Sequence, residues 1–362
     1  MRPGNSDSAE PRERSPKNAT VLWLALVLLA VLLGIRFIHL AADPPMEFAD
    51  FGNAVITDPY FYTAYARNDA LYGHWDPYHE HRFTMFQYSL VSVAARVVFG
   101  LGGVSRVTAN LAAVLLHLFG IFFFLWAIYD RERPALTVIT ALFLLGNILS
   151  FFYSRYPLLE NGLLFLVGVT CLAFFKLRHP TARAIVTGAL IALAALTGKL
   201  FGYLLLGPVI VVLVAEYRRQ AVRPILVSLA STALVSVGYL FLVGGGSLQP
   251  YFDYLGDVKT TTNSLIGLTS AYHYAAAFLT YVMQTRIPEF FGILIPAALA
   301  GWLFSTSDNW DDAPSALRLS LFAITWILLT MVALAPADYR PARYTMMLYL
   351  PLAYLAAECC YR

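Results

Sequence analysis

The sequence is built from blocks of apolar residues, most of them long enough to cross a lipid bilayer as a helix. A spanning helix needs roughly 20 apolar residues, and a soluble domain has no use for many such blocks. Hydrophobic residues make up 59% of the 362 residues and charged residues only 13%, about half the charged share of a typical soluble domain. We therefore predict an all-α polytopic membrane protein with about ten transmembrane helices. The blocks lie at approximately 20–42, 107–129, 135–154, 159–176, 184–198, 200–215, 224–245, 288–305, 318–336 and 344–358.

The same composition excludes several other classes of protein. A soluble enzyme, a disordered chain and a disulfide-rich secreted domain would not carry these blocks, and the three cysteines form no pair in a polar loop. The net charge of +3 is small, and no basic stripe alternates with aromatic residues. Nucleic acid is therefore not expected as a partner.

Basic residues between the blocks predict how the helices are oriented, because Lys and Arg favour cytoplasmic loops. The basic clusters share one side only if the ambiguous block 84–103 does not span. We expect that block to be a helix at the outer interface, with Arg96 and Arg106 reaching lipid headgroups. The clusters are the N-terminal tail, Arg131/Arg133, Lys176/Arg178/Arg183, Arg218/Arg219/Arg223, Arg318 and Arg362. The resulting layout is a disordered cytoplasmic tail at 1–19 and a membrane domain at 20–362. Its first extracytoplasmic loop, at 43–106, contains juxtamembrane helices.

Ionisable residues that this topology places at the outer face are candidates for function, because charges at membrane depth are costly. Carboxylates and cations from distant parts of the chain meeting at one interface suit a site with a base and a pocket for an anionic headgroup. Apolar helices around such a site suit a lipid tail. The candidates are Asp58, Arg155, Glu160, Lys199, Arg340 and Arg343.

Each candidate also has a purely structural explanation. Asp58 precedes a proline and could cap the start of a helix. Glu160 could be an interfacial residue paired with Arg155, and Lys199 could extend to lipid headgroups. The two arginines near the C-terminus could likewise anchor the chain in the lipid. The residues alone leave these alternatives open.

The segments that contain these residues resemble membrane glycosyltransferases of the C superfamily. The run DPYFYTAYARNDALYGHW from Asp58 is similar to the first-loop motif of the branch that contains protein O-mannosyltransferases and the lipid A aminoarabinose transferase. In that branch an acidic pair opens the motif, followed by Tyr, Ala-Arg and Gly-x-Trp at similar spacing. Pro59 stands in place of the second acidic residue, which leaves Asp58 without that partner.

Three later segments add to the resemblance, which covers roughly residues 20–215 well and the remainder loosely. The segment from Ser154 to Glu160 resembles the family's second-loop segment with its acidic residue. The turn Thr197-Gly198-Lys199 resembles a Thr-Lys-Gly turn with the last two residues exchanged. Arg343-Tyr344 resembles the family's late Arg-Tyr segment.

The resemblance implies transfer of a sugar from a polyprenyl-phosphate donor to a hydroxyl of a lipid, glycan or protein outside the cytoplasm. A single displacement with Asp58 as base implies inversion at the anomeric carbon, and Glu160 would orient the acceptor. A divalent metal ion stays open as a cofactor, with Asp58 and Glu160 as its ligands. The implied location is the plasma (inner) membrane of a prokaryote, with a cytoplasmic N-terminus. The implied phosphate-binding residues are Lys199, Arg343 and Arg340, and the implied supporting residues are Arg155, Arg67 and Tyr62.

Two other classes of function remain open at this level. A transporter or lipid flippase also needs carboxylates and cations in the membrane, although it would place them near mid-membrane. A non-catalytic membrane subunit of the same fold is the other, and Pro59 is the main argument for it. Relatives commonly carry more helices and often a C-terminal soluble domain. We therefore expect either a short member of the family or a chain truncated at its C-terminus.

Overall fold

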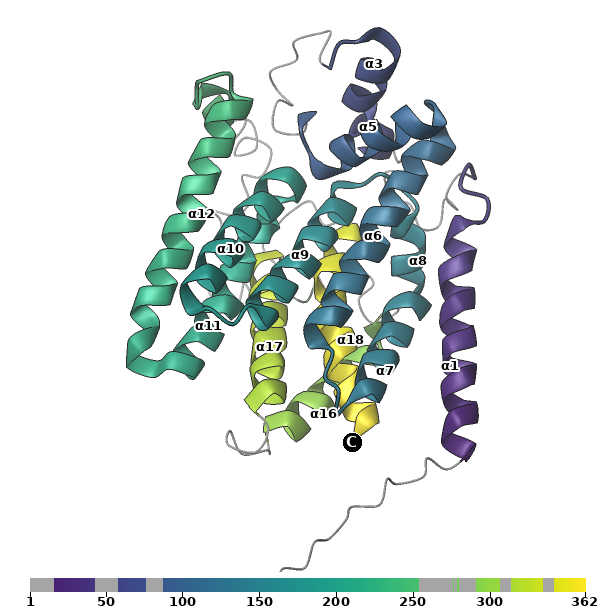
Figure 1. Cartoon of the computed structure of the whole chain (residues 1–362), viewed down its shortest axis with the longest axis vertical. Helices are drawn as coiled ribbons and strands as arrows, with labels where there is room; N and C mark the ends of the chain where they lie inside the picture. The colour runs from purple at the N-terminus through teal and green to yellow at the C-terminus, as the bar shows by residue number, and fades with distance from the viewer. Residues whose placement is uncertain are drawn as a thin grey trace, which may run out of the picture.

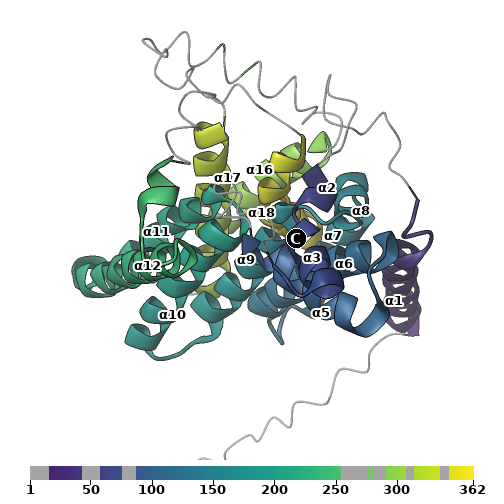
Figure 2. The same cartoon turned by 90° about the horizontal axis from the view of Figure 1, so that it is seen from above.

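The computed structural model describes residues 16–42, 58–75, 87–253, 276, 279, 291–306, 314–334 and 342–362. Within these ranges every regular element is a helix, which confirms the predicted all-α fold. Most helices run side by side in one bundle, and the short helices α3 (Ala64–Tyr72) and α5 (Leu90–Gly102) lie over its upper end in Figure 1. Seen from above, in Figure 2, α3 and α5 lie over α6 (Arg106–Ile128) and α9 (Leu159–Lys176).

Helices occupy most of the described part of every predicted apolar block. Judged by length and composition, four helical segments of the described chain could cross a membrane. The number is five if the bent pair of α7 (Pro134–Gly146) and α8 (Ile148–Ser154) counts as one span. One of the four, Leu200–Val243, covers 44 residues and includes both α11 (Leu206–Tyr217) and α12 (Val222–Val243). The expectation of about ten transmembrane helices therefore stays a prediction. The bundle helices are α1 (Pro16–Gly34), α6 (Arg106–Ile128), α7 (Pro134–Gly146), α8 (Ile148–Ser154), α9 (Leu159–Lys176), α10 (Pro180–Leu193), α11 (Leu206–Tyr217), α12 (Val222–Val243), α16 (Leu294–Thr306), α17 (Pro314–Leu334) and α18 (Met346–Tyr361).

Two boundaries differ from those predicted. α1 begins at Pro16, so residues 16–19, which were expected in the disordered tail, are helical. Proline suits this position because the first turn of a helix leaves its N–H groups unpaired. The block expected as one span at 135–154 is broken into α7 and α8, which meet at 65°. Asn147 causes the break: its backbone is extended, and its side chain accepts a hydrogen bond of 2.8 Å from the Leu149 N–H at the start of α8.

The described part of the first loop contains three short helices, α2 (Asp58–Phe61), α3 (Ala64–Tyr72) and α5 (Leu90–Gly102). α5 has 13 residues, about 20 Å of helix, which is less than the roughly 30 Å hydrocarbon core. Arg96 does not extend freely to headgroups as predicted, because its guanidinium pairs with Asp69 and joins α5 to α3. Arg106 lies over the ring of Tyr60, 5.9 Å from its centroid.

Small residues bring α6 and α9 into close contact. A Cβ atom at Gly120 would lie 2.7 Å from the Leu164 carbonyl oxygen, and one at Gly168 would overlap the backbone of Gly120. Helices in a membrane associate through such close packing, because lipid offers no hydrophobic driving force between them. The crossing fixes α9, which begins one residue before Glu160.

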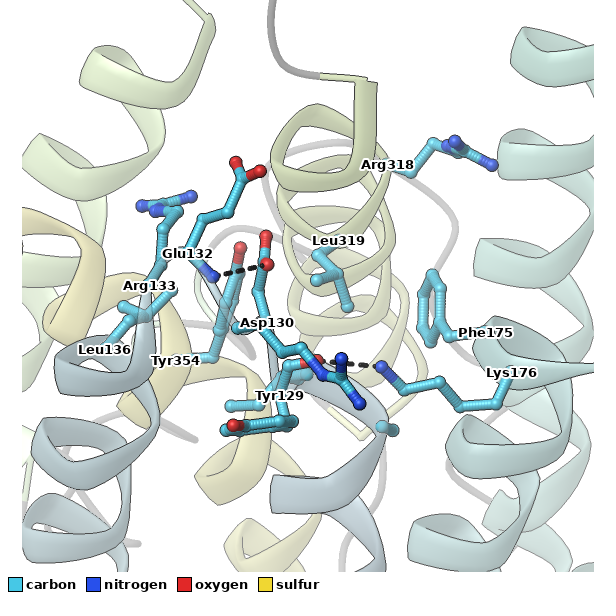
Figure 3. A pocket seen from close by; sticks show the side chains of 13 residues that line it. Tyr129, Asp130, Glu132, Arg133, Leu136, Phe175, Lys176, Arg318, Leu319 and Tyr354 are labelled. Atoms are coloured by element: carbon cyan, nitrogen blue, oxygen red, sulfur yellow. Dashed lines mark hydrogen bonds between the residues drawn. The ribbon is translucent and has the colours of Figure 1, made fainter. Parts of the chain in front are cut away.

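Residues from three of the basic clusters predicted to share one side of the membrane meet at one end of the bundle. Arg131 and Arg133, Lys176 at the end of α9, and Arg318 in α17 line one pocket of about 420 Å³ (Figure 3). Glu160 stands at the other end of α9. The grouping agrees with the predicted alternation of loops, and the assignment of this end to the cytoplasm stays a prediction.

Candidate active site

Glu160, Lys199 and Arg343 come together from three distant parts of the chain. Glu160 Oε1 lies 3.6 Å from Lys199 Nζ and 3.3 Å from Arg343 Nε. All three side chains are largely buried, with exposed fractions of 2% for Glu160, 15% for Lys199 and 4% for Arg343. The structure thus places three of the predicted site residues in one cluster, which we call the Glu160 cluster.

Glu160 is held by the turn that precedes α9. It lies in the first turn of this helix, where a carboxylate is favoured by the helix dipole. The next residue, Asn161, donates from Nδ2 to the carbonyl oxygens of Tyr153 and Tyr156, at 2.9 and 2.7 Å. These bonds tie the end of α8 to the start of α9, and they orient the first turn that carries Glu160.

Lys199 is placed by an interruption between two helices. It is an extended residue between a π-helical turn, Ala194–Gly198, and a 3-10 segment, Leu200–Leu205. A Cβ atom at Gly198 would lie 2.9 Å from the Cα of Leu163, so only glycine lets this turn approach α9 so closely. Leu163 is one turn beyond Glu160, and the close approach therefore brings Lys199 beside the carboxylate.

Arg343 and Tyr344 lie in a 3-10 turn, Ala342–Thr345, just before α18. Lys199 Nζ is 3.4 Å from the Tyr344 hydroxyl oxygen and 4.9 Å from its ring centroid. Phe201 packs edge-on against the Tyr344 ring at 4.9 Å. The tyrosine therefore forms an aromatic wall beside both cations, because the Arg343 guanidinium also lies 5.7 Å from its ring centroid.

The first loop reaches the same cluster through Tyr62. This residue is buried and interacts electrostatically with Lys199. Asp58 begins α2, about one helical turn before Tyr62, and its side chain lies outside the described part of the structure. Its predicted role as a base therefore stays a prediction.

The charges of the Glu160 cluster favour an anionic ligand. Two cations face one carboxylate, which leaves a net positive charge in a buried setting. Neither carboxylate oxygen of Glu160 has a hydrogen-bond partner among the described residues, although both cations lie within ion-pair distance. A phosphate group placed here would meet two cations and a tyrosine hydroxyl at reduced dielectric, where such contacts are strong.

Other predicted site residues lie elsewhere. Arg155 donates from Nη2 to the carbonyl oxygens of Ile38 and His39, at 2.6 and 2.5 Å, so its expected contact with Glu160 is not seen. Arg67 is exposed and bonds to the side chain of its neighbour Asn68, at 3.0 Å. Arg340 lies outside the described residues. No group of three His, Cys, Asp or Glu side chains that could hold a metal ion occurs in the described chain.

A buried polar network behind the site was missed by the sequence analysis. Arg36 is fully buried and donates to the Leu145 carbonyl at 3.0 Å and to Ser150 Oγ at 3.1 Å. His117 lies between Ser150 Oγ, at 2.8 Å, and Asn161 Oδ1, at 2.9 Å. This chain of contacts ends at Asn161, the residue that follows Glu160. The signal available in the sequence was an arginine inside the first apolar block.

No protein-family model matches this chain, and no curated protein matches it either. Two solved structures share its fold. The crystal structure of ArnT from Cupriavidus metallidurans bound to undecaprenyl phosphate has a TM-score of 0.63 and 18% sequence identity, and the match covers 96% of this chain and 61% of that one. The apo structure of the same protein has a TM-score of 0.60 and 16% identity, covering 96% and 60%.

The chain therefore has the fold of ArnT, and the apolar helices of its described part are those of a multi-pass membrane protein. The likeness to ArnT, a lipid A aminoarabinose transferase, supports the resemblance read from the sequence motifs. At this level of identity it shows the fold alone. The closeness to protein O-mannosyltransferases stays a prediction.

Proposed function

We propose that this protein transfers a sugar from a polyprenyl-phosphate donor to a hydroxyl group of a lipid, glycan or protein on the extracytoplasmic side. The observation that carries the proposal is the Glu160 cluster, in which two buried cations and a tyrosine surround one carboxylate. The fold is shared with a structure that holds undecaprenyl phosphate. A lipid phosphate fits both the positive charge of the cluster and the ligand held by the structure of the same fold.

In this proposal the acceptor oxygen attacks the anomeric carbon while the bond between that carbon and the phosphate oxygen breaks. The acceptor proton passes to the Asp58 carboxylate, and the electron pair of the broken bond leaves with the polyprenyl phosphate. Lys199 and Arg343 stabilise the charge that develops on the phosphate. Glu160 holds the two cations in place, in addition to the acceptor-orienting role implied by the resemblance.

A binding experiment tests the donor class. Wild-type protein and the Lys199→Ala variant are purified in mild detergent and compared by native mass spectrometry. We expect a polyprenyl phosphate, with or without its sugar, to co-purify with the wild type and to be lost from the variant. The matched control is Lys176→Ala at the opposite end of α9, which should retain the lipid. Ordinary phospholipid alone in all three proteins would contradict the proposal.

A second experiment separates an enzyme from a non-catalytic subunit of the same fold. Asp58→Asn removes the base while it keeps the shape of the side chain, and loss of a general base costs about 10²- to 10⁴-fold in rate. Transfer is measured in membranes at equal expression, with Asp130→Asn, at the opposite end of the bundle, as the control. Activity of Asp58→Asn near the wild-type level would show that another group accepts the proton.

A further inference from the structure

A second cavity, of about 810 Å³, lies at the end of the bundle opposite to the Glu160 cluster. It is formed where α10 begins, α11 ends and α12 begins, around the turn Arg218–Ala221. Side chains of two kinds line it. Arg219 and Arg223 are basic, whereas Pro224, Leu226 and Val227 are apolar.

The basic side chains of this cavity are not neutralised by any group in the described part of the chain. Among the described residues no Asp or Glu lines the cavity, and Arg219 and Arg223 form no ion pair or hydrogen bond there. Glu216, the acidic residue just before Tyr217, is already engaged by two other arginines. Its Oε2 lies 3.0 Å from Arg183 Nη2, and its Oε1 lies 3.4 Å from Arg318 Nη1.

In the pocket of Figure 3, which lies at the same end of the bundle, carboxylates balance the positive charges. Its cations share the space with Asp130 and Glu132, and Arg133 pairs with the buried carboxylate of Glu358. Lys176 Nζ donates to the Tyr129 carbonyl at 2.8 Å. That pocket offers an anion little excess charge, whereas the cavity beside Arg219 and Arg223 offers two free guanidinium groups.

Two helix starts add to the positive potential of the second cavity. Two helices, α10 with 14 residues and α12 with 22, begin at its wall. Helix N-termini carry unpaired N–H groups and partial positive charge. Tyr217 lines the same wall, but its hydroxyl group is already engaged, because it accepts a 2.8 Å bond from Arg183 and interacts with Glu216.

An apolar surface continues from the charged part of the cavity. Val222 and Leu226, in the first turns of α12, are 62% and 60% exposed. In a membrane protein, exposed apolar side chains beside free cations match a molecule with an anionic head and hydrocarbon chains. A free phosphate ion would use the cations and leave this surface without a role.

We propose that this cavity binds the phosphodiester headgroup of an anionic phospholipid, with Arg219 and Arg223 on the phosphate and the acyl chains along α12. The inference is independent of the proposed sugar transfer, because Lys199 and Arg343 lie at the other end of the bundle.

Lipid titration tests the assignment. Purified protein in detergent is titrated with dioleoylphosphatidylglycerol and, separately, with dioleoylphosphatidylcholine, and the bound lipid is counted by native mass spectrometry. We expect the first phosphatidylglycerol to bind about tenfold more tightly than phosphatidylcholine, since each basic residue near a lipid headgroup adds to the affinity. The double variant Arg219→Gln/Arg223→Gln should lose that preference, and each single variant should lose part of it.

Two controls make the result specific to the cavity. Arg178→Gln removes an exposed arginine at the same end that does not line the cavity, and it should leave the preference unchanged. The double variant Arg219→Lys/Arg223→Lys keeps both charges and should retain most of it. Both arginines are exposed, so the unfolding temperature should not change.

Three outcomes would overturn the proposal. A double Gln variant that binds both lipids as the wild type does would remove the arginines from any site. An equal loss in Arg178→Gln would reduce the effect to general surface charge. Displacement of phosphatidylglycerol by millimolar inorganic phosphate, with that competition lost in the double Gln variant, would make this a site for free phosphate.

Discussion

Glu160 is the residue that joins the two cations of the candidate site. Its carboxylate is 2% exposed and faces both Lys199 and Arg343. Removing one partner from a buried ion pair costs about 3–5 kcal/mol, because the remaining charge is left without compensation. In Glu160→Gln two buried cations would face each other, so we expect a thermal unfolding temperature lower by several degrees.

A ligand measurement makes this prediction specific to the site. Undecaprenyl phosphate should raise the unfolding temperature of Glu160→Gln more than that of the wild type, because its phosphate supplies the missing negative charge. Glu132→Gln, an exposed carboxylate at the other end, should change neither value. An unfolding temperature of Glu160→Gln equal to that of the wild type would show that the two ion pairs contribute nothing.

At the scale of residues, the sequence predicts which groups share one face, but it does not predict which pairs form. The alternation of basic loops placed Glu160, Lys199 and Arg343 on one side, and the structure brings them within 3.6 Å. Arg155 was expected beside Glu160 and instead bonds to the chain after α1. That partner is 117 residues away in sequence, and only the packing of α1 against the bundle decides it.

At the scale of elements, the turn Ala194–Gly198 decides where Lys199 lies. A methyl group at Gly198 would lie 2.9 Å from Leu163 Cα, against backbone that cannot move aside easily. We expect Gly198→Ala to push the turn away from α9, separate Lys199 from Glu160 and lower affinity for polyprenyl phosphate at least as much as it lowers stability.

The chain offers a matched control for this substitution. A Cβ atom at Gly238, within α12, would meet no atom within 4 Å. Gly238→Ala should therefore be neutral or stabilise the protein by up to about 1 kcal/mol, since alanine favours helix over glycine. Lipid binding by native mass spectrometry and thermal unfolding check both variants, and equal behaviour of the two would contradict the role of Gly198.

Hydrophobic blocks predict where helices lie better than where they break. The block at 84–103 contains a helix as expected, α5, Leu90–Gly102, and its place at the membrane interface stays a prediction. The block at 135–154 shows no loss of apolar character, yet it bends by 65° after α7. A single residue, Asn147, turns the backbone there, and one polar residue does little to a hydropathy pattern taken over 20 positions.

At the scale of the whole molecule, the position of α5 decides whether an even or an odd number of spans separates the N-terminus from the later basic loops. If α5 lies at the interface, all the basic loops share one side and the N-terminus is cytoplasmic. If α5 spanned, the basic loops from Arg131 to Arg223 would change sides relative to the N-terminus. The 13 residues of α5 favour the first arrangement, and labelling of cysteines in cells can test it.

Two exposed positions report on the two ends of the bundle. Leu71 in α3 is 54% exposed, and Arg178 is exposed in the loop after α9. In a background with Cys171, Cys359 and Cys360 replaced by Ala, we expect a membrane-impermeant maleimide to label Leu71→Cys in intact cells. Arg178→Cys should react only after permeabilisation. If both cysteines were labelled from outside, an even number of spans would separate them, as when α5 crosses the membrane. The reverse pattern would mean that the whole molecule has the opposite orientation in the membrane.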